Sequence, residues 1–215
     1  MSRVAGEPIA AAPAPTLTVA MVEAYRTLFT VPVPPDTPLR HWGPGAFLQN
    51  NVDWIEQERR RADLPDVVRL ALDASRGWHE NPPVGIDEVQ DPVIAQGDAR
   101  IDNMLWDGVR FRLIDFEGFG VGDLAFEVAD LAEHISARLP GLRDTDAVID
   151  GFSLGPPRRE RVQAYRIVLA TLWLLEVLPG NRGEALNPEG TAALQAVHLL
   201  NLLGRPGRGI VEDAG

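Results

Sequence analysis

The sequence predicts an α+β fold that is mainly helical, with one short β-hairpin carrying a polar loop. Two observations predict it. Most of the chain has apolar residues at helical spacing between proline-rich breaks, whereas the segment from Pro92 to Ile114 has short apolar runs around Asp107-Gly108, a strong hairpin signal. A chain of 215 residues can bury one sizeable core. We therefore expect one domain over residues 1–204, followed by a loose tail over residues 205–215.

The expected elements follow from caps, prolines and apolar spacing. Thr18 is a candidate cap for the first helix, and Pro65 suits the first turn of the third. Asp123 can cap the helix that follows the glycine-rich stretch. Helices are expected over residues 18–29, 46–62, 65–76, 123–138, 144–152, 157–178 and 188–203, and strands over residues 92–95, 104–106 and 109–114. Residues 5–15 are expected to form an extended entry segment.

The composition limits the kinds of site that the chain can hold. It contains no cysteine, which excludes disulfides, thiol catalysis and thiolate metal sites within it. Its formal charge of −11 disfavours nucleic acid as a partner. The charge would suit a cationic small molecule, or it reflects acids on solvated helix faces that serve solubility. No apolar run is long enough to cross a bilayer, and the first residues show no signal pattern. We therefore expect a cytoplasmic protein with no membrane partner.

A polar loop and the end of the hairpin carry the candidate site. The loop reads Gln96-Gly-Asp-Ala-Arg-Ile-Asp-Asn103, and Asp115 follows the second strand. Folding the chain at Asp107-Gly108 brings Asp98, Asn103 and Asp115 to the same open end of the hairpin. Phosphoryl-transfer sites need a carboxylate that orients the attacking hydroxyl, and oxygen ligands for magnesium. We therefore expect Asp98 to be the catalytic base, rather than an aspartate that only caps local backbone groups, and Asn103 and Asp115 to be ligands of a Mg²⁺ ion on nucleotide phosphates.

The same residues carry a family resemblance. The polar loop and the runs Leu113-Ile-Asp-Phe-Glu117 and Gly120-Val-Gly-Asp-Leu-Ala-Phe-Glu-Val-Ala-Asp130 resemble the C-terminal lobe of the aminoglycoside phosphotransferase family. That family is similar to choline kinases and, more remotely, to protein kinases. The resemblance implies the C-terminal lobe of a protein-kinase-like fold with a short catalytic β-hairpin. It also implies the roles assigned to Asp98, Asn103 and Asp115, and transfer of the ATP γ-phosphoryl group to a hydroxyl of a small molecule.

The resemblance covers about residues 2–203 and places Met1 at the hinge between the two lobes of the family. It implies that the nucleotide-covering lobe, with its glycine-rich loop, strand lysine and partner glutamate, is missing from this sequence. All 20 basic residues are arginine, so the phosphate-pairing lysine of a kinase is not in this polypeptide. The sequence is then a truncated reading of a longer gene, a lobe whose counterpart is supplied elsewhere, or a protein that has lost activity.

Four positions need separate expectations. Gln96 stands where the family usually has histidine; it can hydrogen-bond but cannot titrate near neutral pH. Arg100 stands where histidine is frequent, and we expect it either to reach a nucleotide phosphate or to form a solvated salt bridge. Glu117 either meets a protonated substrate amine or pairs with a neighbouring arginine. His134, at the end of an amphipathic helix, is expected to be structural.

Two further functions are open from the sequence. The chain can be a non-catalytic kinase-lobe remnant that acts as a ligand- or protein-binding module, with an apolar face exposed where the other lobe packed. Gly151-Phe-Ser-Leu-Gly155 matches the pattern of a hydrolase nucleophile, with His198 downstream. That motif needs a strand before the serine and a helix directly after it, whereas a helical stretch precedes Ser153 and Pro156-Pro157 follows.

Overall fold

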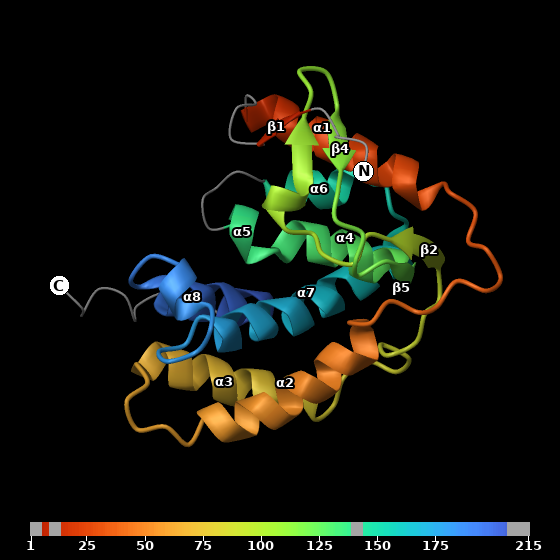
Figure 1. The fold of residues 1–215 in the computed structure, drawn as a ribbon. Helices are drawn as coiled ribbons and strands as arrows, with labels where there is room; N and C mark the ends of the chain where they lie inside the picture. The colour runs from red at the N-terminus through yellow and green to blue at the C-terminus, as the bar shows by residue number, and fades with distance from the viewer. Residues whose placement is uncertain (1–5, 9–13, 139–143, 206–215) are drawn as a thin grey trace. The chain divides into compact units, whose positions relative to one another are not determined.

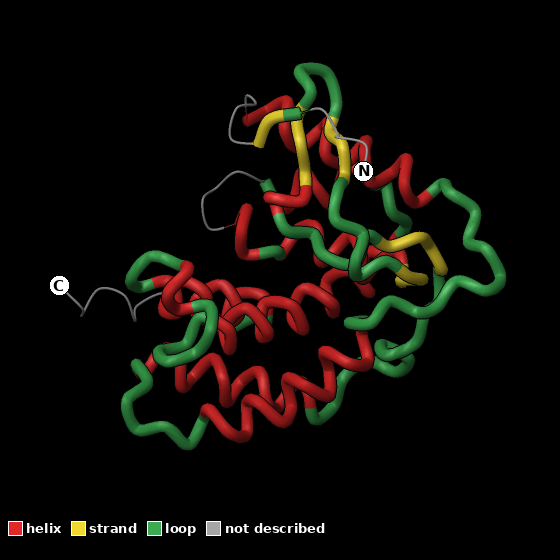
Figure 2. The backbone as a smooth tube through the Cα atoms, in the orientation of Figure 1, coloured by secondary structure: helices red, strands yellow, loops and turns green. Residues whose placement is uncertain are grey.

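The computed structural model of the chain describes residues 6–8, 14–138 and 144–205. Helices account for most of these residues and two small sheets complete the fold, which confirms the predicted α+β, mainly helical class (Figure 2). The chain forms two compact units, one of residues 1–43 and 87–162 and the other of residues 44–86 and 163–215. The tail predicted over residues 205–215 stays a prediction, because residues 206–215 lie outside the described part.

The first unit contains both sheets, and each is antiparallel (Figure 1). β1 (Glu7–Pro8), β3 (Met104–Trp106) and β4 (Phe111–Leu113) form one sheet in the order β1-β3-β4. β2 (Pro92–Ala95) and β5 (Gly120–Asp123) form the other. The sheets therefore place the loop between β2 and β3 at the junction of two strand pairs.

Helices support this junction within the first unit. α1 (Ala14–Phe29) packs against β2, β4 and α6 (Thr145–Gly151), and α4 (Leu124–Glu133) packs against β2, β5 and α6. All α4 residues after Leu124 are buried. α5 (Ile135–Arg138) follows directly, and α7 (Pro156–Glu176) begins in this unit and continues into the other.

The sequence predicts neither β1 nor β5, and β5 shows why. Gly120 and Gly122 are poor strand formers by propensity, so the Gly-Val-Gly-Asp segment does not stand out. Close packing requires them nevertheless. A Cβ on Gly120 would lie 2.5 Å from the backbone nitrogen of Arg40, and a Cβ on Gly122 would lie 2.2 Å from Glu127 Oε1. Tertiary contacts, which a local pattern does not contain, select this strand.

The hairpin turn is longer than the two-residue Asp107-Gly108 turn that the sequence predicts. Trp106 pairs with Phe111, so the turn spans residues 107–110 and the second strand begins at Phe111 rather than Val109. The Asp107 carboxylate accepts hydrogen bonds from the backbone N–H groups of Val109 (3.0 Å) and Arg110 (2.9 Å). An aspartate that caps the following backbone in this way replaces strand pairing over two residues.

One helix prediction is wrong at its start and another in its middle. α1 begins at Ala14, so Thr18 lies inside the helix and does not cap it. The helix predicted over residues 123–138 is broken at His134, which has an extended backbone (ψ 122°) between α4 and α5. The capping role of Asp123 is confirmed, because its Oδ1 accepts the N–H groups of Ala125 (3.0 Å) and Phe126 (3.4 Å).

The second unit is helical. It consists of α2 (Pro44–Glu58), α3 (Asp66–His79), most of α7, and α8 (Thr191–Leu202), with a short 3₁₀ turn over Glu184–Leu186. α3 packs against both α2 and α8. The core of this unit is built from fully buried aliphatic side chains, among them Val68, Leu72, Leu174, Leu199 and Leu200 of these helices and Leu178 just after α7. No described helix in either unit is long and apolar enough to cross a membrane.

Candidate active site

The loop between β2 and β3 is held in a tight backbone path at its start. Gly97 has φ +97°, and a Cβ there would lie 2.1 Å from the carbonyl oxygen of Gly118. Only glycine fits this combination of a left-handed φ and close backbone contact. The path places Asp98 at the mouth of the loop, with 46% of its side chain exposed.

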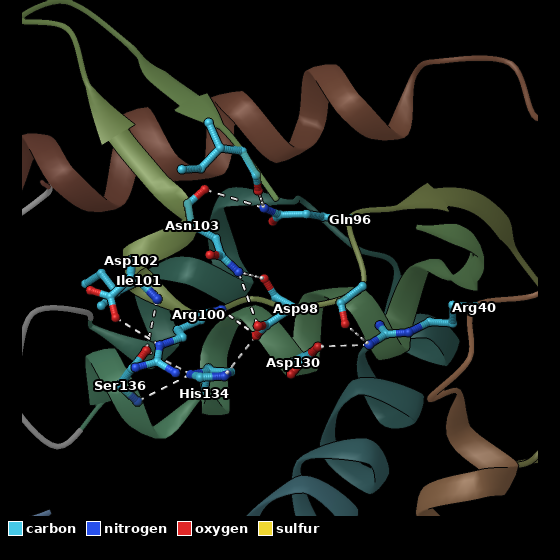
Figure 3. Close-up of polar contacts among 12 residues, drawn as sticks. Arg40, Gln96, Asp98, Arg100, Ile101, Asp102, Asn103, Asp130, His134 and Ser136 are labelled. Carbon is cyan, nitrogen blue, oxygen red and sulfur yellow. Dashed lines mark hydrogen bonds and ion pairs between the residues drawn. The ribbon is translucent and has the colours of Figure 1, made fainter. Parts of the chain in front are cut away.

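The Asp98 carboxylate is surrounded by hydrogen-bond donors (Figure 3). Oδ1 accepts the backbone N–H of Arg100 (3.1 Å), and His134 Nε2 lies 3.4 Å from the same oxygen. Oδ2 accepts the side-chain amide of Asn103 (3.2 Å). The hydrogen bond from His134, followed by those from Arg100 and Asn103, holds the pKa of Asp98 below its usual range, although partial burial opposes them. Asp98 is therefore ionised at neutral pH and partly open to solvent.

His134 is the residue that sequence reasoning placed outside the site. The break between α4 and α5 turns its ring toward Asp98 (Figure 3). Its Nδ1 lies 2.8 Å from the hydroxyl of Ser136 and accepts the Ser136 backbone N–H at 3.3 Å. The sequence does not predict this contact between the imidazole and the candidate base. The helical apolar pattern of residues 123–138 hides the break that makes this contact.

Asn103 and Asp115 lie at the same end of the hairpin, as the sequence predicts. Met104 pairs with Leu113, and the N–H of Ile114 donates to the carbonyl of Asn103 (3.0 Å). Asn103 turns its amide nitrogen toward Asp98, which leaves Oδ1 as a hard oxygen donor. Asp115 is exposed and has φ 59°, a left-handed conformation that is uncommon outside glycine.

Gln96 holds the backbone on both sides of the open end of the hairpin. Its Nε2 donates to the carbonyl of Asn103 (3.4 Å) and to the carbonyl of Ile114, while its Oε1 accepts the hydroxyl of Tyr25 (2.5 Å). Gln96 and Tyr25 are 1% and 2% exposed. The glutamine thus joins the backbone at Asn103 to the backbone just before Asp115, and it does so without a titratable group.

A buried arginine secures the other side of the loop. Arg40 Nη1 contacts Glu127 Oε1 (2.5 Å), and Nη2 contacts Asp130 Oδ2 (3.4 Å) and the carbonyl of Gly97 (3.0 Å). Its guanidinium also lies 5.0 Å from the ring centre of Phe126. Burial disfavours its charge, but the two carboxylates outweigh burial and raise the pKa of Arg40. Burial also raises the pKa of Glu127 to about 7 against the opposing effect of Arg40.

The remaining predicted residues, Arg100 and Glu117, are both exposed. Arg100 pairs with Asp102 through a 2.9 Å contact between Nε and Oδ2, with side chains 52% and 67% exposed. Glu117 is exposed in the turn between β4 and β5. Among the described residues, no hydrogen bond or ion pair links Asp115 to Asp98 or Asn103. The hairpin register and the Gln96 hydrogen bond to the Ile114 carbonyl hold the backbone before Asp115 at the site. No group of three or more histidine, aspartate or glutamate side chains is arranged to hold a metal ion in the described part.

These donors fit Mg²⁺ better than an ion that needs a closed protein cage. Magnesium is bound through one or two protein oxygens, keeps several waters and takes its other oxygens from phosphates. Asn103 offers one amide oxygen, and Asp115 offers an exposed carboxylate at the same end of the hairpin.

Ser153 does not have the surroundings of a hydrolase nucleophile. It follows α6 rather than a strand, with φ 52°, and its N–H bonds to the carbonyl of Asp150 at the helix end. A nucleophile elbow needs a strand before the serine. The structure thus confirms the helical context that argued against this motif.

Comparisons with known proteins agree with the fold. A choline/ethanolamine kinase family protein from Mesorhizobium loti is 17% identical, with a TM-score of 0.59, and the match covers 88% of this chain and 62% of that one. The choline kinase LicA from Streptococcus pneumoniae is 14% identical, with a TM-score of 0.56 and coverage of 94% and 66%. A thermostable aminoglycoside phosphotransferase APH(4)-Ia in ternary complex with ADP and hygromycin B is 19% identical, with a TM-score of 0.57 and coverage of 96% and 71%.

These likenesses confirm the kinase-like fold that the sequence resemblance implies. The chain spans about 62% of the length of the Mesorhizobium loti structure and 66% of LicA. No curated protein sequence matches the chain significantly. The family model described as the phosphotransferase enzyme family, abbreviated APH, matches residues 1–165 of the 215. The chain therefore belongs to the phosphotransferase enzyme family.

Proposed function

We propose that this chain carries the phosphoryl-transfer residues of a small-molecule kinase that moves the γ-phosphoryl group of ATP to a hydroxyl. The observation that carries the proposal is the Asp98 carboxylate. It is ionised, 46% exposed, and hydrogen-bonded to Asn103, the neighbouring candidate metal ligand. A carboxylate held in this way can accept a proton while a hydroxyl attacks phosphorus.

In the proposed reaction, the loop supplies the group that accepts the proton of the acceptor hydroxyl. The acceptor hydroxyl forms a bond to the γ-phosphorus, its proton passes to Asp98, and the bond from phosphorus to the bridging oxygen breaks with its electron pair leaving on ADP. Asn103 Oδ1 and Asp115 are the residues that would hold Mg²⁺ on the nucleotide phosphates. When bound, the ion neutralises phosphate charge. Gln96 keeps the backbone at these two ligands at a fixed separation.

ATP as co-substrate is supported by the solved structures. LicA is reported in complex with AMP, and the APH(4)-Ia structure holds ADP. The latter also holds hygromycin B, and LicA is a choline kinase, so these relatives act on small molecules. For the present chain we propose a cationic acceptor that contains a hydroxyl, because the chain has a formal charge of −11 and the exposed Glu117 precedes Gly118, whose backbone packs against Gly97 of the loop. A cytoplasmic location is in keeping with ATP use.

Nucleotide binding is the first test. Isothermal titration of the 215-residue chain with ADP is expected to show binding with Mg²⁺ and much weaker binding with excess EDTA. Asp115→Asn is expected to weaken the Mg²⁺-dependent part, whereas Asp36→Asn, which changes an exposed loop acid of the same unit, leaves it unchanged. If the wild-type chain binds no magnesium nucleotide, the non-catalytic remnant becomes the better interpretation.

Turnover is the second test. Coupled detection of ADP, with amino sugars, amino alcohols and neutral sugars as acceptors, is expected to show transfer to cationic acceptors. Asp98→Asn is expected to reduce kcat by about 10²- to 10⁴-fold with little change in ADP affinity, because it removes the proton acceptor and keeps the shape. Equal turnover in the wild type and Asp98→Asn would contradict the assignment of the base.

A further inference from the structure

The break between α4 and α5 turns the ring of His134, which has no role in the proposed reaction so far, toward Asp98. α4 ends at Glu133, and the N–H of His134 still donates to the carbonyl of Asp130 (3.0 Å). The chain then turns extended for one residue, and the His134 side chain is 9% exposed beside Asp98. Which nitrogen of this nearly buried imidazole carries a proton decides whether the ring donates a hydrogen bond to the candidate base.

Ser136 fixes the position of that proton. Its backbone N–H can only donate, and it points to His134 Nδ1 at 3.3 Å. Its hydroxyl oxygen already accepts the N–H of Ile101 (3.0 Å), so the hydroxyl proton is available for the 2.8 Å contact with the same Nδ1. Nδ1 is therefore an acceptor. A neutral imidazole carries one proton, which must then be on Nε2, the nitrogen that faces Asp98 Oδ1 at 3.4 Å.

The two carboxylate oxygens of Asp98 therefore face different numbers of N–H groups. Oδ1 faces two N–H groups, those of Arg100 and His134, whereas Oδ2 accepts one, from Asn103. Each carboxylate oxygen offers about two lone-pair positions. The donors thus fill Oδ1 and leave a position open on Oδ2 in a carboxylate that is 46% exposed.

We infer that His134, held by Ser136, is a positioning residue that fixes the rotation of the Asp98 carboxylate and makes Oδ2 the atom that accepts the proton of the attacking hydroxyl. Hydrogen bonds at catalytic groups are frequently long before substrate binds, so the 3.4 Å contact is of the expected kind. The catalytic part of this inference rests on the proposed function; the arrangement of the ring and its proton does not.

The arrangement is tested without turnover. In the full chain labelled with ¹⁵N-histidine, long-range ¹H–¹⁵N correlation spectra distinguish the two neutral tautomers, and His134→Gln identifies the signals of His134. We expect the Nε2–H tautomer at neutral pH, and we expect Ser136→Ala to perturb the Nδ1 signal. A stable Nδ1–H tautomer would overturn the inference even if the chain is an active kinase.

The positioning role is tested by kinetics. His134→Ala is expected to reduce kcat by about 10- to 100-fold with an unchanged KM for ATP, since a misplaced base affects the reacting geometry rather than nucleotide binding. His134→Gln restores a side-chain N–H donor and is expected to recover most of the loss, and His41→Gln is the exposed control. An equal decrease of kcat in the Ala and Gln variants, or an increase of KM with unchanged kcat, would overturn the positioning role. An inactive wild type with the Nε2–H tautomer would instead refute the proposed function together with the catalytic part of the inference.

Discussion

Each unit buries a histidine beside a serine, yet the two rings have opposite arrangements. In the first unit His134 Nδ1 accepts the N–H of Ser136, and Nε2 faces a carboxylate. In the second unit His79 Nδ1 lies 2.9 Å from the carbonyl of Ser75, so it must donate, and Nε2 accepts the amide of Asn51 (3.2 Å). The partner available at each nitrogen, rather than burial, decides which one carries the proton.

The surroundings of the two rings differ in charge as well. The His79 network runs through the Ser75 hydroxyl to Thr171 (2.7 Å), and Asn51 also donates to the carbonyl of Val168 (2.8 Å); every member is uncharged. Around the loop of the first unit, a guanidinium and carboxylates hold the backbone. Charged groups there can orient a reacting group, while the neutral network only joins helices. The two networks thus differ at their ends, because the contacts of His134 end on a partly exposed carboxylate, whereas those of His79 involve only uncharged groups.

The largest expected effect is the loss of the buried charge in the first unit. Arg40→Met leaves Glu127 and Asp130 without their cation and the carbonyl of Gly97 without a donor. We expect a loss of about 3–5 kcal/mol in the free energy of unfolding, measured with urea. Arg158→Met, which removes an exposed pair with Asp91, is the matched control and is expected to cost at most about 1 kcal/mol. Similar losses in the two variants would contradict the charge-based account of the loop.

For the uncharged network around His79 we expect a pH dependence of the unfolding free energy that is nearly as large. Burial lowers the pKa of His79 to about 4, although the Ser75 carbonyl opposes this. The unfolded chain binds a proton near pH 6.5 and the folded chain does not, so stability falls as pH drops from about 6.5 to 4. The full effect is about 3 kcal/mol. Unfolding of the second unit, followed by fluorescence of its tryptophans, is expected to lose this dependence in His79→Gln and to keep it in His41→Gln. An unchanged dependence in His79→Gln would show that His79 is not the group responsible.

The positions of the loop residues and of the open end of the hairpin are predicted from the sequence because their signals are local, whereas the turn between the two strands is longer than predicted. Asp98, Asn103 and the hairpin end before Asp115 lie where residue spacing places them, and β2 has the predicted bounds. Local spacing fixes these positions because a hairpin of known register brings its own flanks together. Their assigned roles stay predictions until nucleotide binding is measured.

The parts that escape prediction depend on contacts between distant residues. Arg40 reaches Glu127 and Asp130 from 87 and 90 residues away, and nothing in the sequence around it marks it. His134 is hidden because the apolar pattern continues through the break. β5 is hidden because its glycines are selected by the backbone of Arg40 and the side chain of Glu127. Each case is a tertiary constraint that overrides local propensity.

Gln96 is a neutral residue of the first unit that holds the backbone on both sides of the hairpin end. Gln96→Ala removes the hydrogen bonds that Gln96 makes to the Tyr25 hydroxyl and to the carbonyls of Asn103 and Ile114. We expect a loss of about 1–3 kcal/mol in unfolding free energy and weaker Mg²⁺-dependent ADP binding. Tyr25→Phe removes only one hydroxyl and is expected to cost about 1 kcal/mol with unchanged ADP binding. Loss of stability with full retention of ADP binding in Gln96→Ala would mean that Gln96 does not position the metal ligands.

The smallest effect on stability is expected at Arg100, because its ion pair is exposed whereas the contacts of Arg40 and Gln96 are buried. Its salt bridge to Asp102 is more than half exposed on both sides, so Arg100→Ala is expected to change the unfolding free energy by less than about 0.5 kcal/mol. Nucleotide affinity decides between the two roles. A phosphate contact predicts weaker ATP binding in Arg100→Ala and tighter binding in Asp102→Ala, which releases the guanidinium from its partner. Arg110→Ala, at the opposite end of the hairpin, is the control. Unchanged ATP affinity in both Arg100→Ala and Asp102→Ala would leave Arg100 as a solvated salt bridge, because a guanidinium within reach of a phosphate cannot be removed without cost.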